Sequence, residues 1–421
     1  DHPEREFRGF GMVEQTDAED FAHWVKGGSS NVVEQDLHQE PVVKKSWFHT
    51  GAFLDKDTIL NQFADDYWYA EMARQGFSPA HNEHQLPDAR LIAAPNIDPA
   101  IIDHLNGEEW QQALRACKSM PLRSEIFAHD APLVGATPDQ LQTQLTPYAV
   151  EASNYTIELL QPKGQNKYAV FTTKASEAIT YGYERDTADP RIAHTLNLAF
   201  DEYGNILEKA SIVYPRAGTD AALPPETQAA QSRTFLSFMQ YLFTNDVVGN
   251  DTYRLRVPSE SKTFELKGVT KTGDYYALKD FENIVILATE VPYHQKDNNP
   301  PAGSPQKRLI EHVRSTYYKN DLSEALPLHQ LDSRALQFES YQLAYTPALL
   351  TDIFGTKTSD ALLAEGKFTH SEGDANWWTR SGTMQYKQGA ETATAAADRF
   401  FMPISYTDPF GAVTKVTYLG N

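Results

Sequence analysis

Paired acidic side chains are the residues of this sequence whose type and spacing could do chemistry most simply. Asp65–Asp66 and Glu108–Glu109 each place two carboxyl groups side by side. Two carboxylates that flank a sugar are enough to hydrolyse a glycosidic bond. The aromatic runs Tyr67–Tyr69 and Trp377–Trp378 could stack on sugar rings, although such residues more often pack inside strands and helices. Adjacent pairs also arise by chance among 57 acidic residues, so a carbohydrate-binding or glycoside-hydrolysing all-β protein is kept as the alternative function.

Histidine and cysteine give weaker signals for a metal site or a nucleophile. His81 and His84 have the spacing of ligands on one helical turn, with Glu83 between them. Prolines on both sides predict a loop instead, and loop histidines are usually solvated. Cys117, the single cysteine, lies in a helical pattern with no base nearby, so we expect it to pack as an apolar residue. We expect no metal, no cofactor and no catalytic residue.

Sequence signatures of the common enzyme classes are absent. The chain has no phosphate-binding glycine loop, no G-x-S-x-G nucleophile, no H-E-x-x-H zinc motif and no EF-hand loop. Its formal charge of -20 and its pI near 5.0 disfavour nucleic acid and anionic membranes as partners, because both bind to basic surfaces. No apolar run is long enough to span a membrane. We therefore expect a non-enzymatic protein that binds no nucleic acid and does not insert directly into a membrane.

The elements that must position these residues change in kind along the chain. Residues 1–150 mix short elements: we expect a loop at Gly27–Asp36, a strand with a glycine break at Lys44–Leu54 and a helix at Ile59–Arg74. A long surface loop is predicted for Pro79–Ala100, which is rich in Pro, Asn, His and Asp. A second helix is predicted for Gly107–Met120, with acidic residues in its first turn and basic residues toward its end.

Residues 151–216 read as a ladder of sequential antiparallel strands. Apolar and polar residues alternate with period two between short turns that contain Gly, Pro and Asx residues. The predicted strands are Asn154–Pro162, Lys167–Lys174, Ala178–Asp186, Arg191–Asp201 and Asn205–Pro215.

Residues 217–421 continue the ladder after a loop predicted for Pro215–Gln231. Short helical turns are expected at Thr346–Gly355 and Asp360–Gly366. Further strands are predicted at Thr252–Pro258, Lys262–Gly268, Asn283–Tyr293, Lys307–Tyr318, Phe368–His370, Asn376–Gly382 and Thr383–Gln388.

A short unit of the form Asp, any residue, aromatic, Gly, followed by alternating residues that end in Tyr, occurs twice. The glycine would let the chain reverse, and the aromatic residues would pack neighbouring strands. The residues predicted to serve the repeat and its packing, with the tryptophan pair, are Asp201, Tyr203, Gly204, Tyr214, Trp377, Trp378, Asp408, Phe410, Gly411 and Tyr418.

Seven longer stretches, taken together, resemble one protein family. They are Glu4–Asp17, Ser46–Phe53, Asp189–Arg216, Lys307–Leu322, Leu331–Leu350, Asn376–Gly382 and Phe400–Tyr418. Each is similar to a segment of the B component of bacterial ABC-type (Tc) insecticidal toxin complexes, in the middle to C-terminal region that leads into RHS/YD repeats. The stretches occur in the family's order, although DPFGAVTKVTY is the only clean YD-type unit.

The resemblance implies a mainly β fold with a few short helices, in which a β-strip spiral forms part of a hollow shell. In that family the B and C components enclose the cytotoxic C-terminal part of the C component, and an A-component pore delivers it. The resemblance thus implies a secreted structural shell segment, cut from a longer chain, with the toxin C component as partner and the A-component pore reached through other parts of the B chain. A polymorphic toxin with its own enzymatic domain is disfavoured, because the resemblance extends to the end of the sequence.

Overall fold

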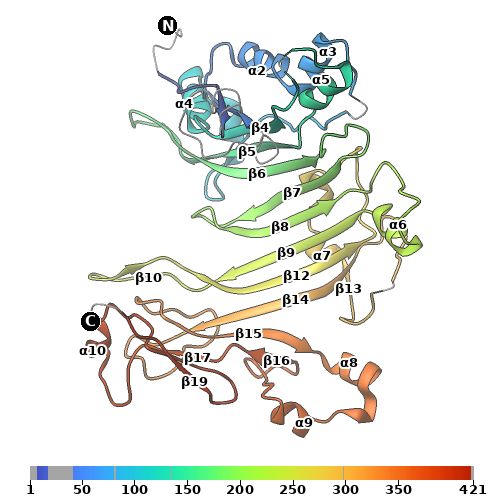
Figure 1. The fold of residues 1–421 in the computed structure, drawn as a ribbon. Coiled ribbons are helices and arrows are strands. Elements are labelled where there is room, and N and C mark those ends of the chain that lie inside the picture. Colours follow the sequence, from blue (N-terminus) through green and yellow to red (C-terminus); the bar gives the residue numbers. More distant parts are fainter. Residues whose placement is uncertain (1–6, 18–40, 80–81, 133, 297, 419–421) are drawn as a thin grey trace, which may run out of the picture. The chain divides into compact units, whose positions relative to one another are not determined.

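A computed structural model describes residues 7–17, 41–79, 82–132, 134–296 and 298–418 (Figure 1). The loop predicted at Gly27–Asp36 lies outside these residues. The chain divides into two compact units. Unit 1 contains residues up to Asn197 with Glu202–Gly204 and Ser211–Phe235, and unit 2 contains Leu198–Asp201, Asn205–Ala210 and the residues from Leu236 onward. Antiparallel strands with short helices between them make up both units, which confirms the predicted mainly β fold.

Unit 1 is built on an antiparallel sheet whose strands follow the order of the chain. Short connections favour pairing of strands that are neighbours in sequence. The sheet has the order β1 (Met12–Thr16), β2 (Val42–Phe48), β4 (Pro121–Ala128), β5 (Ala149–Gln161), β6 (Val170–Gly182) and β7 (Arg191–Phe200), and the short β3 (Arg90–Ala93) pairs in parallel with β5.

The prediction of two separate strands between Lys167 and Asp186 is wrong, because a β-bulge takes the place of the expected turn. The structure has one strand, β6, and the Ala-Ser-Glu run that was taken for a turn lies inside it. The register with β5 shifts at this point, so Ser176 has no partner across the ladder. The side chain of Asn154 compensates, because its Oδ1 accepts the backbone N–H of Glu177 at 2.8 Å. A bulge keeps the strand continuous while it bends.

Short helices cover part of unit 1. They are α2 (Lys56–Asp65), α3 (Trp68–Arg74), the 3-10 helix η2 (Pro99–His104), α4 (Gly107–Ala116), α5 (Pro138–Leu145) and α6 (Pro225–Gln231). Helix α4 confirms the helix predicted at its position. It packs on β5 through a buried cluster in which Ala113 and Cys117 meet Tyr155 and Ile157.

The single helix predicted for Ile59–Arg74 is two helices. Tyr67 separates them with extended backbone angles of φ -68 and ψ 153. The carboxylate of Glu125 accepts the backbone N–H of Trp68, at 3.3 and 3.2 Å, and so binds the first turn of α3. This partner comes from a strand distant in sequence, so local helical spacing could not reveal the break.

Two predicted loops in unit 1 also carry regular structure. The stretch Pro79–Ala100 contains β3, and the side chain of Glu83 within it is only 1% exposed, so the segment is not a surface loop throughout. The stretch Pro215–Gln231 ends in α6, which begins at Pro225. Proline suits the first helical position because its fixed φ matches a helix and its missing N–H would have no partner there.

Unit 2 contains a second run of antiparallel strands, again in chain order. The run is β9 (Phe235–Phe243), β12 (Pro258–Lys267), β14 (Gln306–Tyr317), β15 (Gln337–Tyr345) and β16 (Trp377–Arg380), and β13 (Thr289–Val291) pairs in parallel with β14. Smaller sheets join β10 (Val247–Val248) with β11 (Tyr253–Arg254), and β17 (Thr383–Gln385) with β18 (Ser405–Thr407) and β19 (Val413–Lys415). The strand β8 (Ile206–Val213) is divided between the units: Ile206–Ala210 belong to unit 2, and Ser211–Val213 belong to unit 1.

Short helical segments connect the strands of unit 2. They are η3 (Leu278–Phe281), α7 (Ile284–Leu287), α8 (Pro347–Leu349), the π-helix η4 (Leu350–Phe354), the 3-10 helix η5 (Gly355–Lys357), α9 (Asp360–Glu365) and α10 (Ala393–Asp398). The helical turns predicted at α8 and α9 are confirmed, as is the strand predicted at β14.

The strand predicted for Asn283–Tyr293 is wrong in its first half, which forms α7. Asn283 has a left-handed backbone with φ 56, and its carbonyl accepts the N–H groups of Ile286 and Leu287. Those two side chains are 83% and 63% exposed, so this apolar run is not a buried strand. The strand predicted at Thr252–Pro258 is reduced to β11, and β9 was not predicted.

Candidate functional site

The two carboxylate pairs that could suit a glycosidase have different surroundings. Asp65 and Asp66 are exposed at the end of α2. Glu109 closes the N-terminus of α4, because its Oε2 accepts the backbone N–H of Asn106 at 3.1 Å while the Asn106 side chain accepts from the helix. Glu108 forms an ion pair with Lys163. Neither pair forms two free carboxylates across a cleft.

The histidine pair gives no metal site in the described structure. His81 lies outside the described residues, and the backbone N–H of His84 donates to the Tyr181 hydroxyl at 2.8 Å. Among the residues that the structure describes, no group of three or more His, Cys, Asp or Glu side chains could hold a metal ion. Within the same residues, no helix combines the length and apolar character needed to cross a membrane.

A buried charge cluster in unit 1, here the Arg123 cluster, joins Arg123 to Glu83 and Glu125. The Arg123 guanidinium lies 2.7 Å from an oxygen of each carboxylate, and the three side chains are 5%, 1% and 0% exposed. Glu83 also accepts hydrogen bonds from the Trp68 indole at 2.8 Å and from the Tyr183 hydroxyl at 2.9 Å. Arg123 and Glu125 occupy alternate positions on the buried face of β4, which is the one signal that sequence reasoning could have used.

The electrostatics of the Arg123 cluster favour a structural role. Burial opposes the charge on Arg123, but the two carboxylates outweigh it and raise the pKa of the guanidinium. Burial raises the pKa of Glu125 despite the attraction of Arg123. The adjacent pocket measures about 80 Å³. Typical ligand pockets begin at about 300 Å³, so this pocket is too small for a sugar ring.

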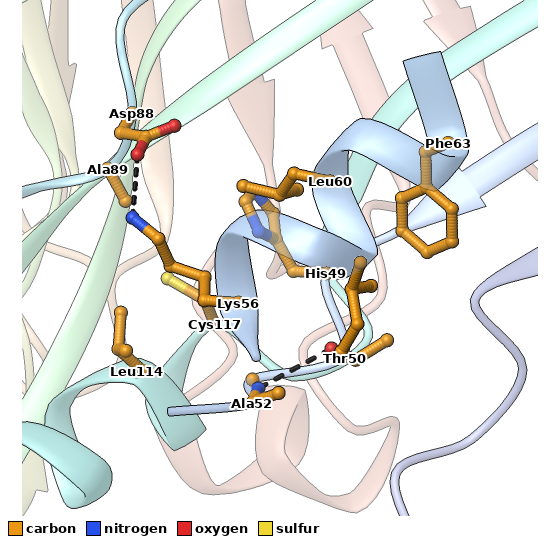
Figure 2. Close-up of a pocket in the computed structure, with 12 residues that line it drawn as sticks. His49, Thr50, Ala52, Lys56, Leu60, Phe63, Asp88, Ala89, Leu114 and Cys117 are labelled. Atoms are coloured by element: carbon orange, nitrogen blue, oxygen red, sulfur yellow. Dashed lines mark hydrogen bonds and ion pairs between the residues drawn. The ribbon is translucent and has the colours of Figure 1, made fainter. Parts of the chain in front are cut away.

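A pocket in unit 1 brings His49 and Cys117 together with Lys56 and Asp88 (Figure 2). Lys56 Nζ lies 2.6 Å from Asp88 Oδ2. Burial raises the pKa of the Cys117 thiol to about 11 and lowers the pKa of His49, so neither group carries the charge of an activated cysteine–histidine pair. The pocket measures about 40 Å³, which holds little more than a water molecule. Cys117 packs as an apolar residue.

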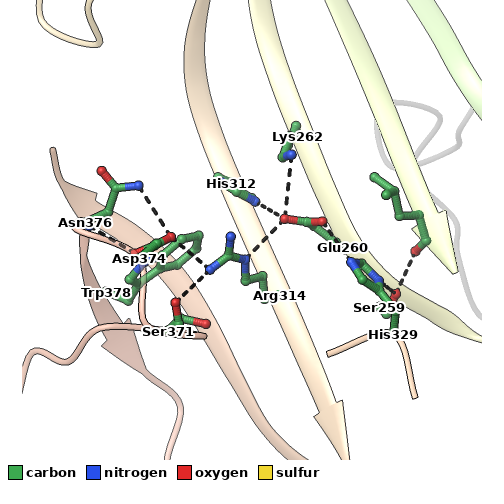
Figure 3. A network of polar contacts seen from close by, with 11 residues as sticks. Ser259, Glu260, Lys262, His312, Arg314, His329, Ser371, Asp374, Asn376 and Trp378 are labelled. Carbon is green, nitrogen blue, oxygen red and sulfur yellow. Dashed lines mark hydrogen bonds and ion pairs between the residues drawn. The ribbon is translucent and has the colours of Figure 1, made fainter. Parts of the chain in front are cut away.

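A second charge network, the Glu260 cluster, lies in unit 2 and is made of Glu260, His312, Arg314 and Lys262 (Figure 3). Glu260 faces Arg314 across the β12–β14 ladder, and Lys262 faces His312. One oxygen of Glu260 lies 2.5 Å from His312 Nε2, 3.2 Å from Arg314 Nε and 3.7 Å from Lys262 Nζ. Burial opposes the ionised carboxylate, but these partners outweigh it and lower the pKa of Glu260 to about 2. The carboxylate therefore holds two strands together as an anion.

Trp378 extends the Glu260 cluster to β16. Its indole N–H donates to Asp374 at 2.9 Å, and Asp374 pairs with Arg314 at 3.0 Å. The Arg314 guanidinium lies over the indole, 4.3 Å from its centre, and Trp378 is 0% exposed. Trp377 is 7% exposed and packs against His370 at a ring distance of 4.2 Å. Both tryptophans are thus placed for packing and leave no open face on which a sugar could stack.

A serine, a histidine and a glutamate in this network have the order of a nucleophile triad. Ser259 Oγ lies 2.8 Å from His329 Nδ1, and His329 Nε2 lies 3.3 Å from Glu260. The Ser259 hydroxyl, however, donates to the carbonyl of Leu242 at 3.1 Å, and the residue is only 2% exposed. A nucleophilic serine must reach its substrate and give its proton to the histidine. This serine is buried and cannot reach a substrate, so the contacts link strands.

The two Asp-x-aromatic-Gly units fold into turns with the same hydrogen bonds. Asp201 N–H donates to the carbonyl of Asn205 at 3.0 Å, and Asp201 Oδ1 accepts from Asn205 N–H at 2.9 Å. Asp408 does the same with Ala412, at 3.0 and 2.8 Å. The glycines that follow, Gly204 and Gly411, have φ of 86 and 89, a region that glycine enters without strain.

The aromatic residues of the two units have different surroundings. Tyr203 and Phe410, inside the turns, are 46% and 69% exposed. Tyr214 is buried, and its hydroxyl lies 3.2 Å from His194 Nδ1. The Tyr418 hydroxyl donates to the carbonyl of Pro403 at 2.8 Å. The turn is therefore the part that the two copies share most closely.

Comparisons with known proteins point to one family. Residues 112–244 match the family model described as the insecticide toxin TcdB middle/C-terminal region. No match was found among curated proteins.

Solved structures of toxin complexes share the fold over almost the whole chain. A crystal structure of TcdB2-TccC3 has a TM-score of 0.65 and 21% sequence identity, and covers 97% of this chain and 18% of that chain. A TcdB2-TccC3-Cdc42 crystal structure has a TM-score of 0.66, 20% identity and the same coverage. The Photorhabdus luminescens Tc holotoxin pore has a TM-score of 0.63 and 21% identity, and covers 96% of this chain and 17% of that chain.

This chain spans less than a fifth of the length of those solved chains. The family match and the shared fold agree on the region of the toxin. Residues 112–244 therefore match the TcdB middle/C-terminal region of insecticide toxins, in agreement with the resemblance to the Tc toxin B component, and the chain has the fold of the matching stretch of TcdB2.

Proposed function

We propose that this chain is a wall segment of the B component of a secreted insecticidal toxin complex. In this role it helps the B and C components to enclose the cytotoxic C-terminal part of the C component, before that cargo passes through the A-component pore. The fold shared with TcdB2 in complex with TccC3, over 97% of this chain, carries the proposal. The β-strip spiral and the hollow shell belong to this proposal, as do the packing roles of the turn and tryptophan residues.

The polar clusters support a wall rather than a catalyst. In both units the buried carboxylates face cations at close range. The Arg123 cluster joins β4 to the segment around Glu83 and to the start of α3, and the Glu260 cluster joins β12 to β14. Paired buried charges hold a unique arrangement of strands, whereas a glycosidase needs two carboxylates in an open cleft. The pockets beside the Arg123 cluster and Cys117 are too small for a substrate. We therefore propose a non-enzymatic role.

A chimaeric toxin tests the proposal. Residues 1–421 replace the matching stretch of TcdB2, and the chimaera is co-expressed with TccC3 and purified. Limited proteolysis then measures how well the C-terminal part of TccC3 is protected. We expect protection close to that of the parent complex. A chimaera with the parent's circular-dichroism spectrum that retains TccC3 but exposes its C-terminal part would contradict the enclosing role.

Carbohydrate assays test the alternative directly. The 421-residue chain is applied to a glycan array and incubated with chromogenic glycosides, with a known lectin and a known glycosidase as positive controls. We expect neither binding nor hydrolysis above background. Saturable binding of one glycan class, weakened by substitution of Trp377 or Trp378, would overturn the wall assignment in favour of a carbohydrate-binding protein.

A further inference from the structure

The lining of an open pocket in unit 1 combines apolar side chains, here called its floor, with three arginines, here called its rim. The pocket measures about 320 Å³, which is within the range of ligand pockets. The start of β7, the residues around the end of β8, and α6 with the chain that follows it line the pocket. The backbone there is fixed by hydrogen bonds from Tyr214 N–H to the carbonyl of Ile192 at 3.0 Å and from Arg216 N–H to that of Gln231 at 2.8 Å.

The floor of this pocket presents apolar side chains to solvent. Val213 is 50% exposed and Phe235 is 49% exposed, and Ala193 is exposed beside them. Removal of apolar surface from water favours association, so an apolar ligand side chain would gain by covering them. Single exposed apolar residues are common, but here they share one depression with charged neighbours.

The rim carries Arg191, Arg216 and Arg233, in a chain whose formal charge is -20. Arg191 pairs with Glu184 at 2.5 Å, but both side chains are about 60% exposed, and such pairs contribute little. Arg216 pairs with Asp189 at 2.8 Å. Burial opposes the Asp189 anion, but hydrogen bonds from Arg216 and the backbone outweigh it and lower its pKa, so this pair stays charged.

Arg233 is the rim cation whose charge is not compensated. Its Nε donates to the carbonyl of Ala229 at 2.9 Å, which orients the guanidinium but leaves its charge unneutralised. No carboxylate pairs with Arg233 among the residues that the structure describes. Guanidinium groups bind carboxylates with two parallel hydrogen bonds, so the rim is suited to a carboxylate.

We propose that this pocket binds a peptide segment in which a large apolar side chain is flanked by carboxylates. The apolar side chain covers Val213 and Phe235, and a carboxylate pairs with Arg233. Charge complementarity selects this occupant over a basic or neutral one, because the pocket's spare charge is positive. The inference rests on the pocket alone and holds whether or not the chain is part of a toxin wall.

Fluorescence anisotropy tests the proposal with the 421-residue chain. The probe is a short fluorescein-labelled peptide in which one phenylalanine is flanked by glutamates. Two control peptides carry lysines in place of the glutamates, or alanine in place of the phenylalanine. We expect saturable binding of the probe alone, weakened by added salt because the contact is ionic.

Matched variants locate the binding site. Arg233→Glu should weaken binding at least about tenfold, the equivalent of one charge-assisted hydrogen bond. Arg254→Glu makes the same change on the exposed strand β11, outside the pocket, and should leave binding unchanged. Phe235→Ala should weaken binding while the charge is kept. Circular dichroism checks the fold of each variant, and Arg233→Gln serves if the charge reversal unfolds the chain.

Three results would overturn the proposal. The first is equal binding of the lysine peptide, and the second is equal binding of the alanine peptide, which would indicate simple ion pairing at the surface. The third is an affinity that Arg233→Glu and Arg254→Glu reduce by the same factor, which would place the contact outside the pocket.

Discussion

Replacing Arg123 with methionine should destabilise unit 1 far more than the loss of an ion pair at the surface would. The substitution leaves Glu83 and Glu125 buried, 1% and 0% exposed, without the cation that lies 2.7 Å from each. Removal of one partner from a buried pair typically lowers the free energy of unfolding by about 3–5 kcal/mol. Here one cation serves two carboxylates, so we expect the upper half of that range.

An exposed pair in the same unit provides the control. Arg74 and Glu71 lie on α3, 2.5 Å apart, with side chains 53% and 31% exposed. Exposed pairs contribute about 0.2–1 kcal/mol, because water and salt screen them. Arg74→Met should therefore lower the free energy of unfolding far less than Arg123→Met does. Both substitutions remove one arginine, so the difference between the two losses of stability measures the effect of burial.

Urea denaturation, followed by tryptophan fluorescence and circular dichroism, measures both variants. The fluorescence of Trp68 reports on the cluster directly, because its indole donates to Glu83. A third variant combines Arg123→Met with Glu83→Gln and Glu125→Gln and removes the uncompensated charge. It should recover a large part of the lost stability, since neutral groups are less costly to bury than charges.

The pH dependence of stability gives a further test of this explanation for Arg123→Met. Burial already raises the pKa of Glu125, and loss of Arg123 removes the charge that opposes this. A carboxyl group whose pKa is higher in the folded state than in the unfolded state favours folding at pH values below the unfolded pKa, and this contribution is lost as pH rises through the folded pKa. The deficit of Arg123→Met should thus shrink as pH falls from 7 toward 5. Equal losses for Arg123→Met and Arg74→Met, or a triple variant no more stable than the single one, would refute the reasoning.

Three further predictions follow from single groups. Gly204→Ala should lower the free energy of unfolding by about 1–2 kcal/mol, because φ of Gly204 is 86. Gly273 has no such positive φ, so Gly273→Ala should change the free energy of unfolding by less than about 0.5 kcal/mol. Urea denaturation measures both changes. Glu260 has a folded pKa of about 2, below the unfolded value of about 4.3, so its contribution to stability is complete above the unfolded pKa and is lost as pH falls through 2. Glu260→Gln should therefore flatten the decline of the melting temperature with falling pH over this window. Parallel melting curves for the two proteins would contradict this. Cys117 has a pKa of about 11 and is 2% exposed, so its thiol should react with a disulfide reagent at pH 8 on the order of 100-fold more slowly in the native chain than in urea. Equal rates would show that the thiol is accessible to solvent.

The strand ladder was predictable because its signals are local. Alternation and turn residues occur within a few positions of each other, so β5, β7, β8, β12 and β14 could be found from sequence. The errors occurred where a distant partner decides the structure. Glu125 binds the start of α3 from a strand 57 residues away, and the side chain of Asn154 supports the bulge at Ser176 from the neighbouring strand. Such contacts leave no mark in the window that a periodicity argument reads.

The polar clusters were missed for a related reason. Glu260 and Lys262 look like solvated charges on an alternating strand, until β14 places His312 and Arg314 opposite them. The paired aspartates and glutamates that drew attention in the sequence proved to be exposed or used as helix caps. Adjacent charges are conspicuous in sequence, whereas charges that meet across a ladder are not.

The chain order of the strands has a consequence for how the protein can be made. Within unit 1, β4, β5 and β6 each pair with the strand that follows in the chain, and β9, β12, β14, β15 and β16 follow the chain in unit 2. Contacts between strands close in sequence form quickly. Each strand can therefore pair with its predecessor while the ribosome is still synthesising the next, and a hairpin inserted or removed at one point would replace only the pairing at that point.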